Sequence, residues 1–194
     1  MKNKALLIID MQNDFVLPDA PQCVAGAVDV INNIEKVLQI CRNKNLPVFH
    51  IIREYRADGS DIEHTRLKDF LQNPYCVPNT EGSKVVSELR PIDGEYKIIK
   101  NRFSGFMQTE LDFMLRRLGV EEIIVCGIQY PNCIRATVFD GISLGYNVTL
   151  IIDATGAKTK KIAEANIFDI LNIGVNCLKT TSVLELMKEH KFRE

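Results

Sequence analysis

The sequence predicts an α/β fold in which an open, mostly parallel sheet of six strands carries helices on both faces. Short apolar runs alternate with longer segments in which apolar residues recur every three or four positions, which is the pattern of βαβ units. The first of these runs, at residues 5–9, is apolar throughout, which suits a strand that is covered on both faces. A length of 194 residues fits one domain with a sizeable core, and we assign residues 1–194 to a single domain.

The first half of the chain contains two of the expected strands. Residues 5–9 form a continuous apolar run, and residues 47–52 are the second expected strand. Between them, helical spacing predicts a helix that stops near Asn45, with an apolar face made of Val28, Ile31, Ile34, Leu38 and Cys41. A turn signal precedes a further helix at about 62–71, and the segment 74–82 is expected to be irregular.

The second half repeats the alternation of strands and helices. Apolar runs predict four strands, at residues 96–100, 122–128, 147–152 and 174–178. Segments of helical period predict four helices, at residues 109–118, 131–144, 162–171 and 182–190. Gly119 and Gly145 directly follow the first two of these helices, where glycine commonly ends a helix, and Pro131 stands at the start of the second.

The charge and cysteine content exclude several classes of protein. With 24 Lys and Arg against 25 Asp and Glu, the net charge of -1 provides no basic excess for nucleic acid. No apolar stretch approaches the roughly 18 residues of a membrane span, and the first run is too short for a signal peptide, so we expect a soluble, cytoplasmic protein. The six cysteines contain no C-x-x-C pair, which argues for free thiols and against a zinc knuckle or a disulfide framework.

Reactive side chains stand at the ends of three expected strands. Asp10 follows the first strand, Lys100 ends the third, and Cys133 comes shortly after the fourth. Ligands bind at the carboxyl ends of the strands in folds of this class, and we expect these three strand ends to lie beside one another. Each residue alone has an ordinary structural role, as a helix cap, a solvated lysine or a small buried residue. Their coincidence favours a shared function.

An acid, an amine and a thiol at one place predict nucleophilic catalysis. The thiolate is the reactive form of cysteine, and a helix start together with the Lys100 ammonium would stabilise it at Cys133. Asp10 can take the thiol proton and return it to a leaving amine. Backbone N–H groups in the turn before Cys133 would point at the developing oxyanion. The three residues therefore predict acyl transfer through a thioester, most often the hydrolysis of an amide.

Four segments of the chain carry a recognisable pattern. They are LIIDMQNDF at 7–15, KNRFSGF at 100–106, the stretch from Gly127 to Thr137, and the stretch from Gly145 to Ala154. In this order they resemble the isochorismatase-like cysteine hydrolases, the superfamily of nicotinamidases, N-carbamoylsarcosine amidohydrolases and ureidoacrylate hydrolases. The resemblance implies a catalytic triad of Asp10, Lys100 and Cys133 and a homo-oligomer.

The resemblance also implies the surroundings of the nucleophile. A non-proline cis peptide maps onto Ile128–Gln129, where it would aim the N–H groups of Gln129 and Cys133 at the oxyanion. Phe15 and Phe106 match positions that often line the substrate pocket, with core packing as the alternative. Position 129 commonly holds a small or hydroxylated residue, whereas Gln129 and Tyr130 are larger and polar here, so we expect them to narrow the pocket or to donate hydrogen bonds to a substrate.

The chain lacks the metal ligands of one branch of this family. Nicotinamidases carry an Asp-x-His pair and a further His after the second strand, whereas residues 52–64 of this chain offer only His64. A first-row metal site usually needs more than one imidazole, so we predict no metal and no other cofactor. Isochorismatase itself lacks the nucleophilic cysteine, so Cys133 argues against that activity too.

Arginines remain near the expected pocket. Arg53 and Arg56 follow the second strand, and Arg135 lies two residues past Cys133. A pair of guanidinium groups can hold a carboxylate or a ureido oxygen, so we count Arg53 among the substrate-binding residues. In the alternative, Arg53 and Arg56 pair with acidic residues of a solvated loop, and Arg135 bonds a neighbouring loop or subunit. We predict a small amide, carbamoyl or ureido substrate, with or without a carboxylate.

Two other functions fit the same residues. In one, the protein binds a small ligand without turning it over. In the other, Cys133 is a redox sensor, because an activated thiolate is also oxidisable. The intact triad argues against pure binding, and no resolving cysteine can be assigned from the sequence. The leading prediction is therefore a metal-independent cysteine amidohydrolase.

Overall fold

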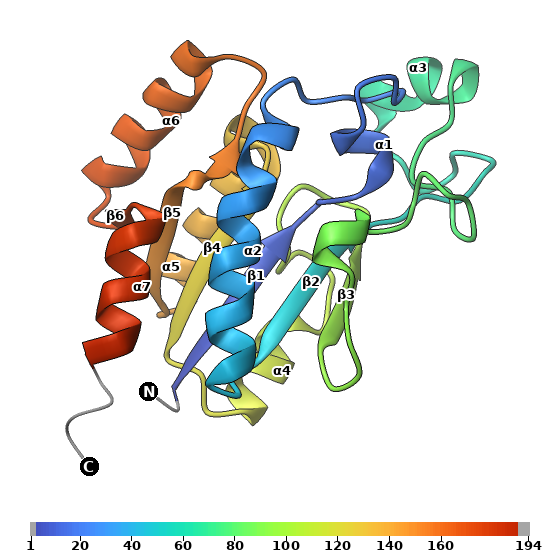
Figure 1. Cartoon of the computed structure of the whole chain (residues 1–194). Helices are drawn as coiled ribbons and strands as arrows, with labels where there is room; N and C mark the ends of the chain where they lie inside the picture. Colours follow the sequence, from blue (N-terminus) through green and yellow to red (C-terminus); the bar gives the residue numbers. More distant parts are fainter. Residues whose placement is uncertain (1–2, 190–194) are drawn as a thin grey trace.

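The computed structural model describes residues 3–189 and has a sheet at its centre (Figure 1). Its strands are β1 (Lys4–Ile9), β2 (Val48–Arg53), β3 (Tyr96–Lys100), β4 (Glu122–Ile128), β5 (Asn147–Gly156) and β6 (Asn176–Leu178). Over the described residues they lie in the order β3-β2-β1-β4-β5-β6, and every pair of neighbours is parallel. This confirms the predicted six-stranded α/β fold, with a sheet that is wholly parallel.

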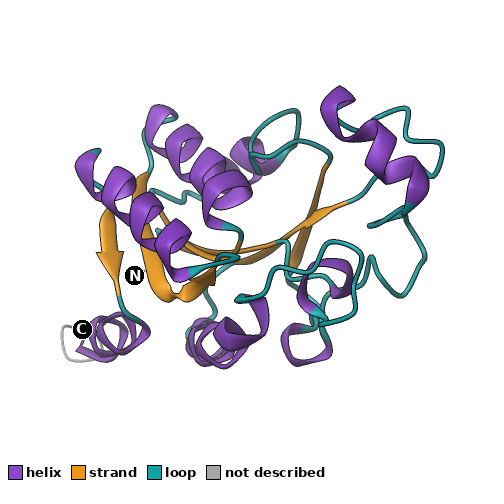
Figure 2. Ribbon diagram, turned by 90° about the horizontal axis from the view of Figure 1, so that it is seen from above, coloured by secondary structure: helices purple, strands orange, loops and turns teal. Residues whose placement is uncertain are grey.

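Helices cover both faces of the sheet, as Figure 2 shows. On one face, α2 (Ala27–Asn43) packs against α7 (Thr180–Glu189). The other face carries α4 (Leu111–Arg117), α5 (Arg135–Ser143) and α6 (Lys160–Asn172). The connections hold short helical segments, namely α1 (Asn13–Val16), α3 (Leu67–Gln72) and the 3₁₀ turns η1 (His64–Arg66) and η2 (Ser87–Leu89). Within residues 3–189 no helix has the length and apolar character needed to cross a membrane.

The packing of β1 explains why its residues are apolar throughout. Successive side chains of a strand point to opposite faces of the sheet. Leu6 and Ile8 pack in the core that includes α2, whereas Leu7 and Ile9 pack in the core that includes α4 and α5. All four side chains are almost completely buried. The continuous apolar run therefore reflects helices on both faces, as predicted.

Some boundaries differ from the predicted ones for reasons that the apolar pattern does not contain. β5 continues to Gly156, past the predicted end at residue 152, because its last residues pair with the end of β4 beyond a β-bulge. The helix predicted at about 62–71 is divided into η1 and α3. The short segments α1 and η2 were not predicted. His190, the last residue of the predicted final helix, lies outside the described residues.

The helix predicted at 131–144 begins with a wider turn. Tyr130–Ile134 form a π-helical turn, η3, and the α-helix α5 starts only at Arg135. The N–H of Ile134 donates to the Gln129 carbonyl at 3.3 Å, which is the five-residue spacing of a π turn. Cys133 therefore lies inside a π turn, a local structure that is frequent at functional sites.

Gly127, near the end of β4, is required by a close contact with β1. Its φ angle is +112°, and a Cβ atom at this position would lie 2.2 Å from the Ile9 carbonyl oxygen. No side chain fits at that distance, so glycine is needed for both the conformation and the space. The contact brings the end of β4, and the turn that carries Cys133, against the segment that leads from Ile9 into Asp10.

Gly127→Ala should therefore destabilise the fold strongly. Gly94 is the matched control, because its φ angle of +91° is also positive but its Cβ would meet nothing within 4 Å. We expect Gly94→Ala to lower the free energy of unfolding by about 1 kcal/mol through the backbone conformation alone. Gly127→Ala should cost at least ~2 kcal/mol more, because β1 and β4 must move apart. Urea unfolding followed by circular dichroism measures both, and equal losses would contradict the contact.

Candidate active site

Asp10 and Lys100 form a buried ion pair at the carboxyl edge of the sheet. Lys100 Nζ lies 2.9 Å from Asp10 Oδ2, and the two residues are 1% and 3% exposed. Asp10 leaves β1 with a φ angle of +53°, in the left-handed region that Asp tolerates better than most residues. This backbone turn ends the strand and leaves the carboxylate beside Lys100.

The three strand ends are not all neighbours, which corrects the prediction from the sequence. β4 lies next to β1, but β2 lies between β1 and β3, and β3 is at the edge of the sheet. The long side chain of Lys100 therefore reaches across the end of β2 to Asp10. The end of β2 becomes part of the site, and its last residue, Arg53, pairs in register with Lys100.

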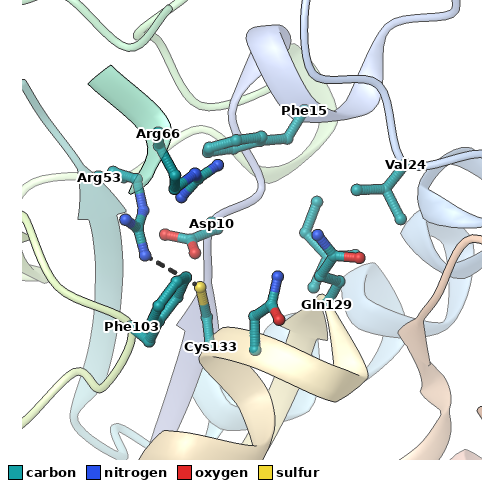
Figure 3. A pocket seen from close by; sticks show the side chains of 10 residues that line it. Asp10, Phe15, Val24, Arg53, Arg66, Phe103, Gln129 and Cys133 are labelled. Carbon is teal, nitrogen blue, oxygen red and sulfur yellow. Dashed lines mark hydrogen bonds between the residues drawn. The ribbon is translucent and has the colours of Figure 1, made fainter. Parts of the chain in front are cut away.

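Arg53 contacts the thiol of Cys133 directly. Its Nη2 lies 3.2 Å from Cys133 Sγ (Figure 3). The same guanidinium donates from Nη2 to the Arg102 carbonyl at 3.0 Å, and from Nη1 to Glu63 Oε1 at 3.1 Å and to the Tyr55 hydroxyl. Arg53 is buried and lines the pocket described below, so it does not lie on a solvated loop or an outer surface.

The surroundings of Cys133 favour the protonated thiol. Burial raises the pKa of Cys133 and the negative charge of Asp10 raises it further, while Lys100 and Arg53 lower it without compensating. The thiolate expected from the helix start and from Lys100 is therefore not the resting form. A buried thiol beside a carboxylate can still react when its proton passes to that carboxylate as the sulfur attacks.

Asp10 has one oxygen available for such a proton. Oδ2 accepts the hydrogen bond from Lys100, whereas Oδ1 is buried and has no hydrogen-bond partner among residues 3–189. Buried polar atoms without a partner are uncommon in folded proteins and call for an explanation. An unpaired carboxylate oxygen close to a thiol is suited to exchange a proton with it or with a bound molecule.

Asp10, Arg53 and Cys133 line a small pocket that is partly open to solvent (Figure 3). Its wall is made of Asp10, Phe15, Val24, Arg53, Arg66, Phe103, Ile128, Gln129, Asn132 and Cys133. The thiol, the carboxylate and the guanidinium of Arg53 therefore share one space that a ligand can enter from solvent.

Of the residues predicted to bind substrate, Phe15 and Arg53 line the pocket and Phe106 and Tyr130 do not. Phe106 stacks on Tyr146, with the ring centroids 5.8 Å apart, in the core that includes α4 and α5. Tyr130 is fully buried, and its hydroxyl donates to a carbonyl of β5 at 3.0 Å. Core packing therefore accounts for both of these side chains.

The peptide bond between Ile128 and Gln129 is cis. Both residues line the pocket, between the end of β4 and the turn that holds Cys133. Figure 3 shows Gln129 across the pocket from Arg53. The turn thus brings an amide side chain and the backbone around the cis bond to the same space as the thiol.

The sequence did not reveal four of the pocket residues, Val24, Arg66, Phe103 and Asn132. Phe103 and Asn132 lie inside the segments already singled out around Lys100 and Cys133, so their proximity to the site could have been inferred from those segments. Arg66 lies on η1, well away from any strand end in the sequence although it is close to the strand ends in space, and no pattern in the sequence points to it.

Arg56 and Arg135 lie outside this pocket. Arg56 is on an exposed loop, with its guanidinium 3.7 Å from the Asp58 carboxylate, as the alternative from the sequence proposed. Arg135 lies 3.4 Å from Asp169 and stacks over the ring of Phe139 at 4.5 Å. Neither residue is therefore positioned to hold a substrate beside Cys133.

The donor set does not fit the metal site of nicotinamidases. The residue that β2 contributes to the pocket is Arg53, whose guanidinium has no lone pair to offer a cation. His64 lies on η1 and is not a pocket residue. In the part of the chain that the structure describes, no group of three or more His, Cys, Asp or Glu residues is arranged to hold a metal ion.

Comparison with known proteins identifies the family. The model of the isochorismatase domain matches residues 4–182. A protein of Arabidopsis thaliana described as a probable inactive nicotinamidase is 40% identical over 192 residues, covering 97% of this chain and 96% of the relative. The ureidoacrylate amidohydrolase of Caulobacter segnis is 30% identical over 189 residues, covering 87% of this chain and 79% of that enzyme. The crystal structure of an isochorismatase family protein from Desulfovibrio vulgaris has a TM-score of 0.93 at 44% identity, covering 97% of this chain and 100% of that one. This chain therefore belongs to the isochorismatase family.

Proposed function

We propose that this protein is a cysteine hydrolase that cleaves the C–N bond of a small amide, carbamoyl or ureido compound through a thioester intermediate. The proposal is supported above all by the meeting of a thiol, a carboxylate and a guanidinium at one small pocket, namely Cys133, Asp10 and Arg53, with the Lys100 ammonium bound to that carboxylate. A protein that only binds its ligand does not need a nucleophile and a base at the same place. Relatives named as an amidohydrolase and an amidase support the hydrolysis of amide-type bonds.

In the first half of the proposed reaction, Cys133 attacks the carbonyl carbon of the substrate while its proton passes to Asp10 Oδ1. A C–S bond forms, and an electron pair of the carbonyl double bond moves to the oxygen. The N–H groups of Gln129 and Cys133 are the proposed donors to this oxyanion. Asp10 then gives its proton to the leaving nitrogen, and the C–N bond breaks. An amine or ammonia leaves, and a thioester remains on Cys133.

In the second half, water releases the product. Asp10 takes a proton from the water molecule, whose oxygen attacks the thioester carbon. The C–S bond breaks, and the sulfur regains a proton from Asp10. One substrate and one water molecule are thus converted into an acid and an amine or ammonia, and the protein returns to its starting state.

The two cations have different tasks in this proposal. Lys100 is bound to Asp10 Oδ2 at 2.9 Å, so it holds the carboxylate in place while Oδ1 exchanges the proton. Arg53 lies 3.2 Å from the sulfur and supplies a positive charge beside the thiolate as it forms. Hydrogen bonds to ionised groups are the strong ones, and more so in a buried site. Because Arg53 touches the reacting sulfur, we count it with the catalytic residues.

A second candidate is a family member that binds a small molecule without turning it over. The 40% identical relative from Arabidopsis thaliana is described as a probable inactive nicotinamidase, which favours this candidate. That description concerns one substrate, nicotinamide, and leaves other amides open. A redox-sensing thiol has less support, because sensor cysteines have low pKa values and the pKa of Cys133 is raised. The homo-oligomer stays a prediction.

Cys133→Ser and Cys133→Ala should abolish turnover and leave the fold intact. We expect ammonia release from a panel of amide, carbamoyl and ureido compounds to fall by a factor of about 10³ or more, because the nucleophile is lost. Mass spectrometry should detect an acyl adduct on Cys133 of the unmodified protein. Cys23→Ser, a change at a partly exposed cysteine outside the pocket, is the control. Full activity of the Cys133 variants, or sulfenic acid as the one modification found, would contradict the proposal.

Asp10→Asn should make the Cys133 thiol more reactive toward iodoacetamide, and the same substitution should stop turnover. Asp10 raises the pKa of Cys133, so removing its charge lowers that pKa and increases the thiolate fraction at neutral pH. The curve of iodoacetamide labelling against pH should therefore move to lower pH. Thermal unfolding must be compared in parallel, because the variant leaves the buried Lys100 without its partner. A folded variant with an unchanged labelling curve would remove Asp10 from its proposed role.

Arg53→Gln should have the opposite effect on labelling. Arg53 lowers the pKa of Cys133, so its loss moves the labelling curve to higher pH and slows labelling at neutral pH. Turnover should fall as well, because the thiolate loses its neighbouring charge. Arg53→Lys keeps the charge without the planar fork and should lie between the two. If Arg53→Gln folds and labels like the unmodified protein, its proposed task is disproved.

A further inference from the structure

We infer that Arg66 is the recognition residue for a carboxylate on the substrate, so that the compound hydrolysed is a small amide or ureido acid. The inference rests on the proposed function for the identity of the bond that is cleaved. Binding of an anion at Arg66 does not require turnover and can be tested on its own. The position, the unused donors and the charge balance of the pocket carry the inference.

Arg66 forms part of the pocket wall. It is the last residue of η1, and Figure 3 shows it beside Phe15 with its guanidinium turned toward the interior of the pocket. The side chain is 27% exposed, so a ligand that enters from solvent can reach it. The rings of Tyr75 and Phe103 lie 5.4 and 5.8 Å from its guanidinium carbon. These aromatic contacts hold the group in place without using its N–H donors.

The N–H donors of Arg66 are largely unused. Its acidic neighbour is Glu63, whose Oε2 lies 3.7 Å from Nη1, and the guanidinium makes no hydrogen bond to residues 3–189. Glu63 is itself engaged elsewhere, because Oε1 accepts from Arg53 at 3.1 Å and Oε2 accepts from the Tyr55 hydroxyl at 2.7 Å. A guanidinium offers five donors in a planar fork that matches a carboxylate. Arg66 is therefore free to bind one.

The charge balance of the pocket also favours an anion. The charged residues that line it or pair with its lining residues are Arg53, Arg66, Lys100, Asp10 and Glu63. Three of these are cationic and two are anionic, and Cys133 adds no charge as a thiol. Passing the thiol proton to Asp10 exchanges one negative charge for another, so one positive charge is left over throughout the reaction. In a partly enclosed pocket this excess attracts an anion more strongly than it would in water.

The sequence suggested Arg53 as the residue that binds a substrate carboxylate, but its guanidinium already has hydrogen-bond partners within the protein. Its guanidinium is bound by the Tyr55 hydroxyl, Glu63, the Arg102 carbonyl and the Cys133 sulfur. A substrate carboxylate at Arg53 would have to displace these partners and would compete with the thiolate for the same positive charge. Arg66 has neither constraint. The pocket thus offers one cation for the reacting sulfur and another for recognition.

Two matched pairs of compounds test the inference. Succinamate and succinamide share a chain and a primary amide, but succinamate ends in a carboxylate where succinamide has a second, neutral amide. N-carbamoylglycine and N-carbamoylglycinamide form the equivalent ureido pair. The first readout is protection of Cys133 from iodoacetamide, measured by mass spectrometry of the peptide that contains it, and it needs binding alone. The second readout is ammonia release, with kcat and KM determined separately.

We expect each anionic probe to protect Cys133 at a concentration about tenfold or more below that of its neutral partner, which is the size of one charge-assisted hydrogen bond. Arg66→Gln should remove this preference by weakening the anionic probes alone. Arg66→Lys should keep part of it, because it retains the charge and loses the fork. Arg56→Gln is the matched control: it removes the same charge from an exposed loop outside the pocket and should change nothing.

The outcomes separate this inference from the proposed function. The inference is overturned if the anionic probes protect no better than the neutral ones, if no probe protects, or if Arg66→Gln keeps the preference. It is also overturned if Arg66→Gln, with unchanged thermal unfolding, loses protection by both members of a pair, because Arg66 then shapes the pocket without selecting charge. If the preference depends on Arg66 but no compound is hydrolysed, the inference stands and the hydrolase function fails. If the compounds are hydrolysed and Arg66→Gln changes neither kcat nor KM, the hydrolase function stands and the inference fails.

Discussion

The ion pair between Asp10 and Lys100 joins the ends of two strands that are separated by a third. Both charges are buried, and such a pair is not by itself a source of stability, because each charge loses its hydration. What depends on the pair is geometry: it fixes one oxygen of Asp10 and leaves the other for the pocket. The close contact between Gly127 and Ile9 brings the turn of Cys133 to the same place. The site is therefore assembled by contacts across the sheet edge.

The position of β2 between β1 and β3 gives this site its electrostatic character. Lys100 can reach Asp10 only across the end of β2, and that end contributes Arg53 to the sulfur. Burial nevertheless keeps the pKa of Cys133 raised, so the thiol is protonated at rest. The nucleophile then forms only when its proton has somewhere to go. A thiol that is protonated at rest is also less susceptible to oxidation than one that is permanently ionised.

The central strands could be predicted because burial on both faces leaves a nearly continuous apolar run in the sequence, and the strand predicted at 122–128 coincides with β4. The strand predicted at 96–100 coincides with β3, an edge strand in which Lys97 and Ile99 are exposed. The π turn at Tyr130–Ile134 could not be predicted, because apolar spacing over five residues does not distinguish it from an α-helical turn. The end of β5 depends on its pairing with β4 beyond a bulge, and the residues of β5 alone do not reveal that pairing.

The candidate site divides in the same way. Asp10, Lys100 and Cys133 stand at strand ends or just after them, so a rule about strand ends is enough to single them out. The contact between Arg53 and the sulfur depends on which strand lies between which others, and strand order is not contained in a local pattern. Arg66 lies over the rings of Tyr75 and Phe103, which belong to other segments of the chain, so only the folded chain places it at the pocket.

The location of Arg66 on η1 has a consequence for the evolution of such a protein. The reacting groups stand at the ends of buried strands, where a substitution disturbs the core, whereas none of the residues of η1 is buried. A few substitutions in this turn can therefore exchange the group that meets the ligand while the chemistry remains intact. Ligand preference can drift faster than the fold, and the overall identity of this chain to a relative says little about which compound it accepts.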